Sequence, residues 1–285
     1  MSAEPALNPR TADSAVAPIV GVVGVGELSG ALLSGLLRAG YPADRLLAAA
    51  RSPERAAAVV DRYGVQGAGA AGAAEQADVL LLAVEPRDVR TLLGELAPAL
   101  RPGAPVISLA AGTPLAVLEP GLPERTPVLR GMTNTSVALG KAMSVVAAGA
   151  RAHDEHVDLV VAVLERLGPV LRLPEEQLDA VTALSGTGPA YFYFLVEAMV
   201  DAGILLGLPR ATAHDLIVQT AVGAAAMLRD SGKQPVLLRE SVMSPAGTAI
   251  RAIRVLEDHG VRAAMFAALE AARDRSRELA EDEVQ

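Results

Sequence analysis

The stretch SVMSPAGTAIRAIRVLED, residues 241–258, carries hydroxyls on both sides of a proline and a glycine, directly before an apolar-periodic segment. Proline suits the first turn of a helix because its missing N–H costs nothing there, so we predict a helix over Pro245–Asp258. Ser244 has the character of an N-cap, and the N–H groups of Ala246, Gly247 and Thr248 would be free at the positive end of the helix dipole. Together with the Thr248 hydroxyl, these groups predict a pocket for a small anion such as a carboxylate.

A second motif, GVVGVGELSGALLSGLL over residues 21–37, has the order strand, glycine turn, helix. Gly24 would form the tight turn, and Gly26 would let the backbone approach a pyrophosphate at the helix N-terminus. Ser29 stands where a third glycine often lies, and its small side chain still permits close packing of helix on strand. We predict a dinucleotide site here, with a plain glycine turn as the alternative. Glu27 would oppose a pyrophosphate unless its side chain points to solvent.

The end of the next expected strand, AAARSPER, bears on the choice of cofactor. Enzymes that use NAD normally place an acidic residue here to bind the ribose hydroxyls. This chain has Arg51 and Ser52 instead, with Arg55 a turn later, and a guanidinium with a hydroxyl suits a 2′-phosphate. We therefore predict NADPH as the cofactor, with NADH possible; the alternative is a solvated helix start.

The sequence has few residues suited to metal binding or to lysine-dependent chemistry. The chain has no cysteine, and the pair His153 and His156 in HDEH has no third ligand nearby in the sequence, so we predict no metal site. The two lysines, Lys141 and Lys233, supply lysine-dependent chemistry poorly. Hydride transfer to an already activated acceptor is a better match, because it requires positioning more than an acid or a nucleophile.

The first half of the chain, which must position these motifs, alternates short β-branched runs with helical patterns. This alternation predicts an α/β Rossmann domain with a doubly wound, mostly parallel sheet, and the helical patterns that follow predict an all-helical domain. We expect a mobile tail at residues 1–17, a dinucleotide-binding domain at 18–174 and a helical dimerisation and substrate domain at 175–285. The expected strands are Ile19–Val23, Leu46–Ala50, Asp78–Val84, Pro105–Ala110, Thr126–Arg130 and a strand-like segment at 169–174. The expected helices of the second half are Gly188–Leu206, Arg210–Asp230, Pro235–Val242, Pro245–Asp258 and Val261–Glu281.

Composition limits the class of protein and its partners. The 285 residues have a net charge of −8 and 2% aromatic side chains, so we expect no nucleic-acid partner. The apolar segment at 189–208 contains Glu197 and Asp201, which are costly in lipid, so we expect a buried or interface helix and no membrane partner. The N-terminus does not have the pattern of a signal peptide, and we expect a cytoplasmic protein.

Several separate motifs, in order from Ile19 to Leu279, resemble the pyrroline-5-carboxylate reductase family. They are the glycine motif above, LAVEP at 82–86, ISLAAGTPL at 107–115, LRGMTNTSVALGKAMS at 129–144, VTALSGTGPAYFYFLVEAMVDAGILLGLPR at 181–210 and MSPAGTAIRAIRVLEDHGVRAA at 243–264. The resemblance implies reduction of a cyclic imine carboxylate, 1-pyrroline-5-carboxylate, to L-proline with NADPH. It also implies a helical domain that interlocks into a homodimer, with dimers often assembling into a larger homo-oligomer.

The resemblance also assigns roles to residues. Ser244 and Thr248 would be the catalytic hydroxyls, and the substrate carboxylate would lie at the Ser244–Ala249 turn. The residues expected at the substrate are Ser244, Gly247, Thr248, Ala249 and Asn134, of which Asn134 would also lie beside the nicotinamide. The residues expected at the dinucleotide are Gly24, Val25, Gly26, Glu27, Leu28, Arg51, Ser52, Ala83, Val84, Glu85, Pro86, Ala110, Ala111 and Asn134.

The chain departs from the family's usual motifs at several of these positions. The helix start SPGGTT or SPGGAT is SPAGTA here, so that its closing threonine is Ala249; MPNTP has become Met132–Ser136, and the AVKP lysine is Glu85. Three hypotheses stay open: a pyrroline-5-carboxylate reductase with an altered pocket, a paralogue that reduces another cyclic imine in specialised metabolism, and a non-catalytic nucleotide-binding regulator.

Overall fold

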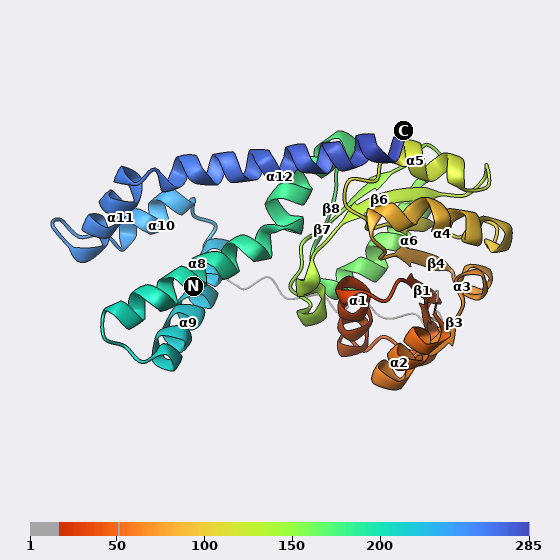
Figure 1. The fold of residues 1–285 in the computed structure, drawn as a ribbon, viewed down its shortest axis with the longest axis horizontal. Coiled ribbons are helices and arrows are strands. Elements are labelled where there is room, and N and C mark those ends of the chain that lie inside the picture. Colours follow the sequence, from red (N-terminus) through yellow and green to blue (C-terminus); the bar gives the residue numbers. More distant parts are fainter. Residues whose placement is uncertain (1–16, 51, 285) are drawn as a thin grey trace, which may run out of the picture. The chain divides into compact units, whose positions relative to one another are not determined.

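The computed structural model describes residues 17–50 and 52–284, which form two compact units (Figure 1). Of the described residues, those at 17–50, 52–131 and 135–175 form the first unit, and those at 132–134 and 176–284 form the second. All of the expected N-terminal tail except residue 17 lies outside the described residues.

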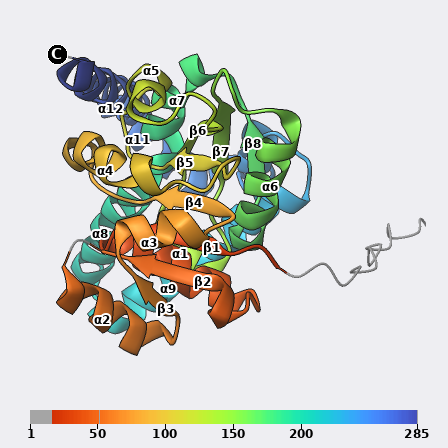
Figure 2. The same cartoon turned by 90° about the vertical axis from the view of Figure 1, so that its right-hand side faces the viewer.

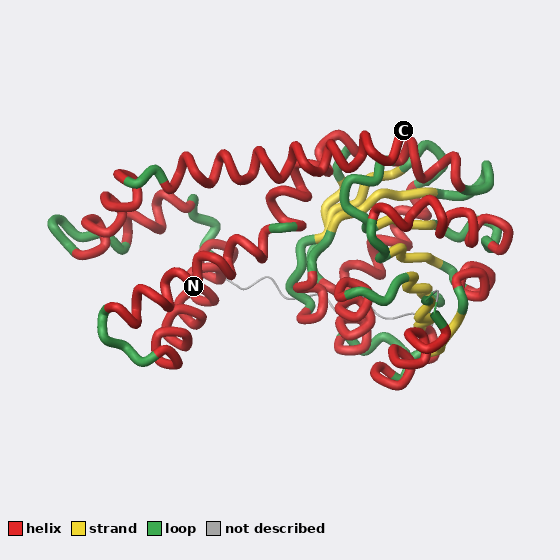
Figure 3. Tube along the Cα trace, in the orientation of Figure 1, coloured by secondary structure: helices red, strands yellow, loops and turns green. Residues whose placement is uncertain are grey.

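The first unit is built on one eight-stranded sheet, drawn in yellow in Figure 3. Its strand order is β3-β2-β1-β4-β5-β6-β7-β8, and the pairs β1–β2, β1–β4, β2–β3, β4–β5, β5–β6 and β7–β8 are parallel. The chain starts in the middle and winds outward in both directions, as in a Rossmann fold, so the strand order reverses beside β1. The strands are β1 Val20–Val23, β2 Leu46–Ala49, β3 Gln66–Ala68, β4 Val79–Leu82, β5 Val106–Ser108, β6 Val128–Met132, β7 Ser144–Ala148 and β8 Val170–Arg172.

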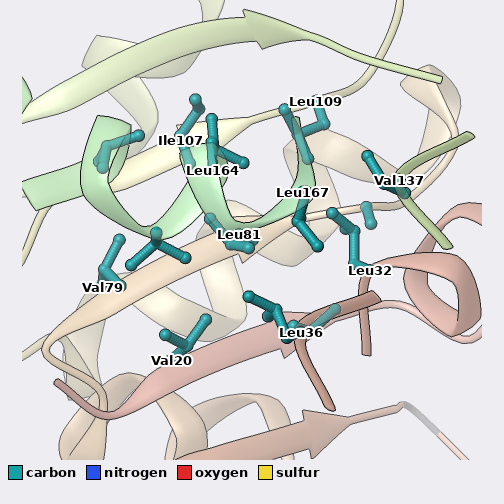
Figure 4. Close-up of a cluster of buried hydrophobic side chains, with 14 of the residues drawn as sticks. Val20, Leu32, Leu36, Val79, Leu81, Ile107, Leu109, Val137, Leu164 and Leu167 are labelled. Carbon is teal, nitrogen blue, oxygen red and sulfur yellow. The ribbon is translucent and has the colours of Figure 1, made fainter. Parts of the chain in front are cut away.

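Helices cover both faces of this sheet because its central strands are apolar on both faces. In β4, Val79 and Leu81 pack in one core cluster with α1 (Glu27–Arg38) and α6 (Asp154–Leu164), as Figure 4 shows. Leu80 and Leu82 point the other way, into a second cluster with α3 (Ala70–Gln76), α4 (Val89–Leu96) and α5 (Leu115–Leu118). Figure 2 shows α4 and α6 on opposite sides of the sheet. Helix α2 (Pro53–Tyr63) follows β2.

Two strands of this unit are absent from the sequence prediction. Strand β3 has no β-branched residue and lies largely exposed beside β2, where pairing with its neighbour rather than hydrophobic patterning makes it a strand. Strand β7, SVVAA, is buried over its first four residues, so its apolar run did carry a signal.

The second unit is helical. Its elements are α7 Leu178–Val181, a π-helical turn at Thr182–Gly186, α8 Gly188–Leu205, α9 Arg210–Asp230, α10 Pro235–Ser241, α11 Thr248–Asp258 and α12 Val261–Val284. Many large apolar side chains on α8 and α9 are exposed, including Phe192, Tyr193 and Phe194, each about two-thirds accessible. Within the described residues, no helix has the length and apolarity that crossing a membrane requires.

Candidate functional site

The glycine turn between β1 and α1 has the backbone that a dinucleotide loop requires. Gly24 has φ +132°, and a Cβ there would lie 2.3 Å from the carbonyl oxygen of Ala83, so the position accepts only glycine. Gly26 is the N-cap of α1, and a Cβ on it would meet nothing within 4 Å. Ser29 is buried and its hydroxyl donates to the Gly26 carbonyl at 2.8 Å, so it takes the place of a third glycine in the packing.

A cavity of about 430 Å³ opens in front of this turn. Five of the predicted dinucleotide residues, at 24–28, come from the loop and the start of α1, and three, at 83–85, follow β4. The cavity is lined by Val23, Gly24, Val25, Gly26, Glu27, Leu28, Ala49, Ala50, Arg55, Ala70, Ala83, Val84, Glu85, Arg87, Asp88 and Leu92. The N-terminus of α1 points its unpaired N–H groups at this end, so the residues present fit the pyrophosphate of a dinucleotide.

Charges of both signs line the cavity. Arg87 and Glu85 form an ion pair at 3.3 Å, with both side chains mostly exposed, so Glu85 is partly compensated by its neighbour. Glu27 lines the cavity and is exposed, so solvent and salt screen the charge of its carboxylate. Surface pairs of this kind contribute little to stability, but they set the local potential that an anionic ligand meets.

The corner after β2 forms the start of α2. Ser52 is its N-cap, accepting from the N–H of Arg55 at 3.4 Å, and the Ser52 hydroxyl donates to the carboxylate of Glu54. The Ser52 hydroxyl and the N–H of Glu54 itself hold the pKa of the Glu54 carboxyl below its usual range. Arg55 lines the cavity, whereas Arg51 lies outside the described residues.

Five other predicted dinucleotide residues do not line this cavity, and one of them, Asn134, is described below. Ser52 lies at the α2 N-cap, and Pro86 begins a short 3₁₀ turn at Pro86–Asp88. The N–H of the buried Ala110 donates to Ser108 Oγ at 3.3 Å, and Ala111 is half-buried. Sequence reasoning in turn missed Ala70, Asp88 and Leu92, which no glycine or charge pattern marked.

The predicted start of the helix at Pro245 is wrong, because α11 begins at Thr248. Ser244, Pro245, Ala246 and Gly247 form a turn closed by the Gly247 N–H, which donates to the Ser244 carbonyl at 3.0 Å. Gly247, not Ser244, is the N-cap of α11. Its N–H is not free, because it closes this turn. The N–H groups left without an intrahelical partner are those of Thr248, Ala249 and Ile250, two residues later than predicted.

This turn places a non-glycine residue in the left-handed region. Ala246 has φ +58°, at the position where a turn with proline second requires a positive φ and favours glycine. An alanine there costs about 1 kcal/mol or more. The hydroxyl of Ser244 lies against Gly247, where a Cβ would approach it to 2.3 Å. The turn therefore brings the Ser244 hydroxyl against Gly247, the N-cap of α11.

Asn134 belongs to the second unit, where its side-chain amide donates to the Ser185 carbonyl at 2.9 Å. Ser185 lies in the π-helical turn, a feature that often marks functional sites. Thr187 and Tyr191 support this turn: their hydroxyls lie 2.9 Å apart, and each lies within 3.1 Å of the Ala183 carbonyl. Sequence reasoning missed this pair, although the hydroxyls at 187 and 191 are one helical turn apart.

The HDEH segment caps a helix. His153 is the N-cap of α6, and its N–H donates to His156 Nδ1 at 3.1 Å. Among the residues that the structure describes, no three side chains of the metal-binding types gather into a group.

Comparisons with known proteins agree with this arrangement. A family model described as pyrroline-5-carboxylate reductase dimerisation matches residues 175–279, and one described as NADP oxidoreductase, coenzyme F420-dependent, matches residues 19–112. The structure of a pyrroline-5-carboxylate reductase from Coxiella burnetii is 31% identical with a TM-score of 0.84, covering 93% of this chain and 99% of that one. The Plasmodium falciparum pyrroline carboxylate reductase, solved with NADP bound, shares the fold at 24% identity and a TM-score of 0.85, covering 92% and 98%.

Curated relatives extend the likeness over nearly the whole sequence. The pyrroline-5-carboxylate reductase of Corynebacterium melassecola is 41% identical over 264 residues, covering 91% of this chain and 98% of that protein. The enzyme of the same name from Pseudomonas aeruginosa is 40% identical over 266 residues, covering 93% and 97%. The chain therefore belongs to the pyrroline-5-carboxylate reductase family.

Proposed function

We propose that this protein reduces 1-pyrroline-5-carboxylate to L-proline with NADPH, with NADH as the alternative cofactor. The observation that carries the proposal is the cavity in front of the glycine turn, in a chain about 40% identical to named reductases over nine-tenths of its length. Three properties of the cavity suit the phosphates of a dinucleotide: its volume, the N–H groups without an intrahelical partner at the start of α1, and the free space beside Gly26.

The residues from Gly24 to Leu28 would hold the pyrophosphate, with Ala83–Glu85 along the neighbouring wall. When bound, the reduced nicotinamide supplies the hydride. Support for a nicotinamide cofactor comes from the matched oxidoreductase model at residues 19–112 and from the NADP in the Plasmodium protein of the same fold. Ser52 and Arg55 at the start of α2 favour the 2′-phosphate of NADPH.

The start of α11 is the proposed carboxylate site. The N–H groups of Thr248 and Ala249 and the hydroxyls of Ser244 and Thr248 would bind the two carboxylate oxygens at the positive end of the helix. A protonated cyclic imine accepts a hydride readily, so the protein needs only to hold the carboxylate, align the ring and exclude water. Asn134, fixed by Ser185, would position the nicotinamide.

The second unit is the proposed homodimer interface. The matched dimerisation model spans residues 175–279, and the exposed apolar side chains of α8 and α9 lie in the same span. Apolar surface on this scale is rare on monomeric proteins. The cytoplasmic location expected from the sequence stays a prediction.

Consumption of NADPH by the purified protein with 1-pyrroline-5-carboxylate, against a panel of five- and six-membered cyclic imines, tests the reaction. We expect the highest kcat/KM on pyrroline-5-carboxylate. A higher value on another imine would favour the paralogue hypothesis, which Ala249 in place of the family's threonine supports. No turnover on any of them would contradict the proposal.

An Ala249→Thr variant tests whether the altered pocket is a drifted form of the family's site. A hydroxyl hydrogen-bonded to a charged group contributes roughly 1.5–3 kcal/mol, so we expect kcat/KM on pyrroline-5-carboxylate to rise by about tenfold or more. Thr248→Ala is the matched control, and it should lower the same value. A clear loss of activity in Ala249→Thr would indicate a pocket adapted to another imine.

A further inference from the structure

At the start of α2, the carboxylate of Glu54 lies where an anionic ligand could bind. The carboxylate of Glu54, in the first turn, accepts a hydrogen bond from the Ser52 hydroxyl, and the helix N-terminus lies behind it. The side chain is exposed, so solvent and ligands can reach it. The Ser52 hydroxyl and the positive end of the α2 dipole therefore already interact with the Glu54 carboxylate. An incoming anion would have to compete with Glu54 for both.

The same corner is where the adenosine ribose of a dinucleotide would be distinguished. It follows β2, next to β1 in the sheet, and Arg55 on the next residue of α2 lines the cavity together with Ala49 and Ala50 at the end of β2. A 2′-phosphate would need the Ser52 hydroxyl, the N-terminus of α2 and the Arg55 guanidinium. NADH carries only a hydroxyl at that position and would need no displacement of a carboxylate.

We propose, on the basis of the function proposed above, that Glu54 is a specificity-determining residue: its carboxylate competes with the 2′-phosphate of NADPH for Ser52 and the α2 N-terminus, and so holds down the preference for NADPH over NADH. Ser52 and Arg55 favour binding of the 2′-phosphate, and Glu54 opposes it. The difference in affinity between NADPH and NADH is therefore smaller than Ser52 and Arg55 alone would produce. The competition is electrostatic at an exposed site, and it weakens as the ionic strength rises.

The test is equilibrium binding, by calorimetry, of adenosine 2′,5′-bisphosphate and adenosine 5′-monophosphate, which differ only in the 2′-phosphate. It compares the unmodified protein with Glu54→Gln. Glutamine keeps an oxygen that accepts from Ser52, so the helix start should be preserved, and circular dichroism verifies the fold. Asp61→Asn is the matched control, because Asp61 is exposed on the same helix, does not line the cavity and lies about 10 Å farther along the axis.

We expect Glu54→Gln to bind the bisphosphate about tenfold more tightly at low salt, with the monophosphate changed less than about twofold, and the gain to shrink at high salt. Asp61→Asn should leave the ratio of the two affinities unchanged, and the ratio of the NADPH to NADH dissociation constants should follow the same pattern. An unchanged ratio in Glu54→Gln, or an equal change for both nucleotides, overturns this inference while leaving the proposed function intact. If the unmodified protein binds neither nucleotide nor either cofactor, the proposed function fails and this inference fails with it.

Discussion

In the first unit, every residue of β1, β2 and β4 is buried, whereas in the second unit the long helices α8 and α9 leave most of their apolar side chains accessible. Among the described residues, the buried hydrophobic side chains of the second unit are few: Met132, Leu178, Ala183, Val200 and Ala213. The sequence is about as apolar in both regions, so composition does not explain the difference. The first unit completes a core of its own, whereas the second has an apolar surface that the proposed dimer would cover.

This contrast separates two sources of stability. Burial inside the first unit acts on the folding of a single chain, while burial on the second unit, under the proposed dimer, acts on association and depends on protein concentration.

Phe194→Asp should have the largest effect, because the side chain is 70% exposed in the single chain and would be buried in the proposed dimer. An unpaired charge in such an interface costs roughly 3–5 kcal/mol, so we expect the dimer dissociation constant to rise by about a hundredfold or more. Sedimentation equilibrium measures it. Ala57→Asp, which adds the same charge to an exposed position on α2, should leave the association state unchanged. A Phe194→Asp protein that stays dimeric would remove α8 from the interface.

Leu81→Ala should lower the stability of the first unit by about 3 kcal/mol, because a fully buried leucine on a central strand is replaced by a cavity. Urea denaturation of the variant and the unmodified protein gives the difference. The dissociation constant of the dimer should not change. If it rose as in Phe194→Asp, the two units would not be separate sources of stability.

Tyr41 makes the first unit sensitive to alkali. Burial raises the pKa of this tyrosine from 10.0 to about 12, and its hydroxyl donates to the Pro18 carbonyl at 2.6 Å. Because the folded pKa lies above the unfolded one, the contribution to stability is complete below pH 10 and is lost as the pH rises toward 12, up to about 2 kcal/mol. Stability measured across that range should fall less steeply in Tyr41→Phe, and equal slopes would contradict the assignment.

Ala246→Gly should stabilise the second unit by about 1 kcal/mol, because glycine adopts the φ of +58° without strain. A rise in Tm of a few degrees is the expected result. Ala249→Gly, three residues later and inside α11, is the control and should lower Tm, since glycine is a poor helix former. A fall in Tm for Ala246→Gly would show that the turn is not strained by its alanine.

Local signals in the sequence predicted most of the scaffold. The apolar runs of β1, β2, β4, β5 and β6 and the helix Arg210–Asp230 were predicted to within a few residues, because burial on both faces and helical periodicity are properties of short segments. Strand β3 could not be predicted in this way, since its neighbour and not its own residues makes it a strand. The tight turn at Gly24 was predicted from the glycine motif, and its positive φ confirms the turn.

The start of α11 shows where such reasoning fails. Pro245 fits both the first turn of a helix and the second position of a β-turn, so proline alone does not distinguish the two structures. The choice depends on Ala246 adopting a positive φ, which alanine does not signal. Likewise, the hydrogen bond from Asn134 to Ser185 joins residues 51 positions apart and has no local pattern.

Residues 132–134 also determine where the chain can be cut to make fragments or chimeras. Met132 ends strand β6, and all three residues precede the last part of the first unit in the sequence, yet they group with the second unit. Met132 is 5% exposed, and its sulfur would lie 2.7 Å from a Cβ on Gly186. A fragment that begins at residue 176 would therefore lack Met132 and the amide of Asn134, and would leave the π-helical turn without both contacts. In a chimera with a related reductase, a single crossover at that point would combine a tripeptide from one parent with helices from the other. The exchangeable module is discontinuous, so a recombination scheme has to transfer both of its segments together.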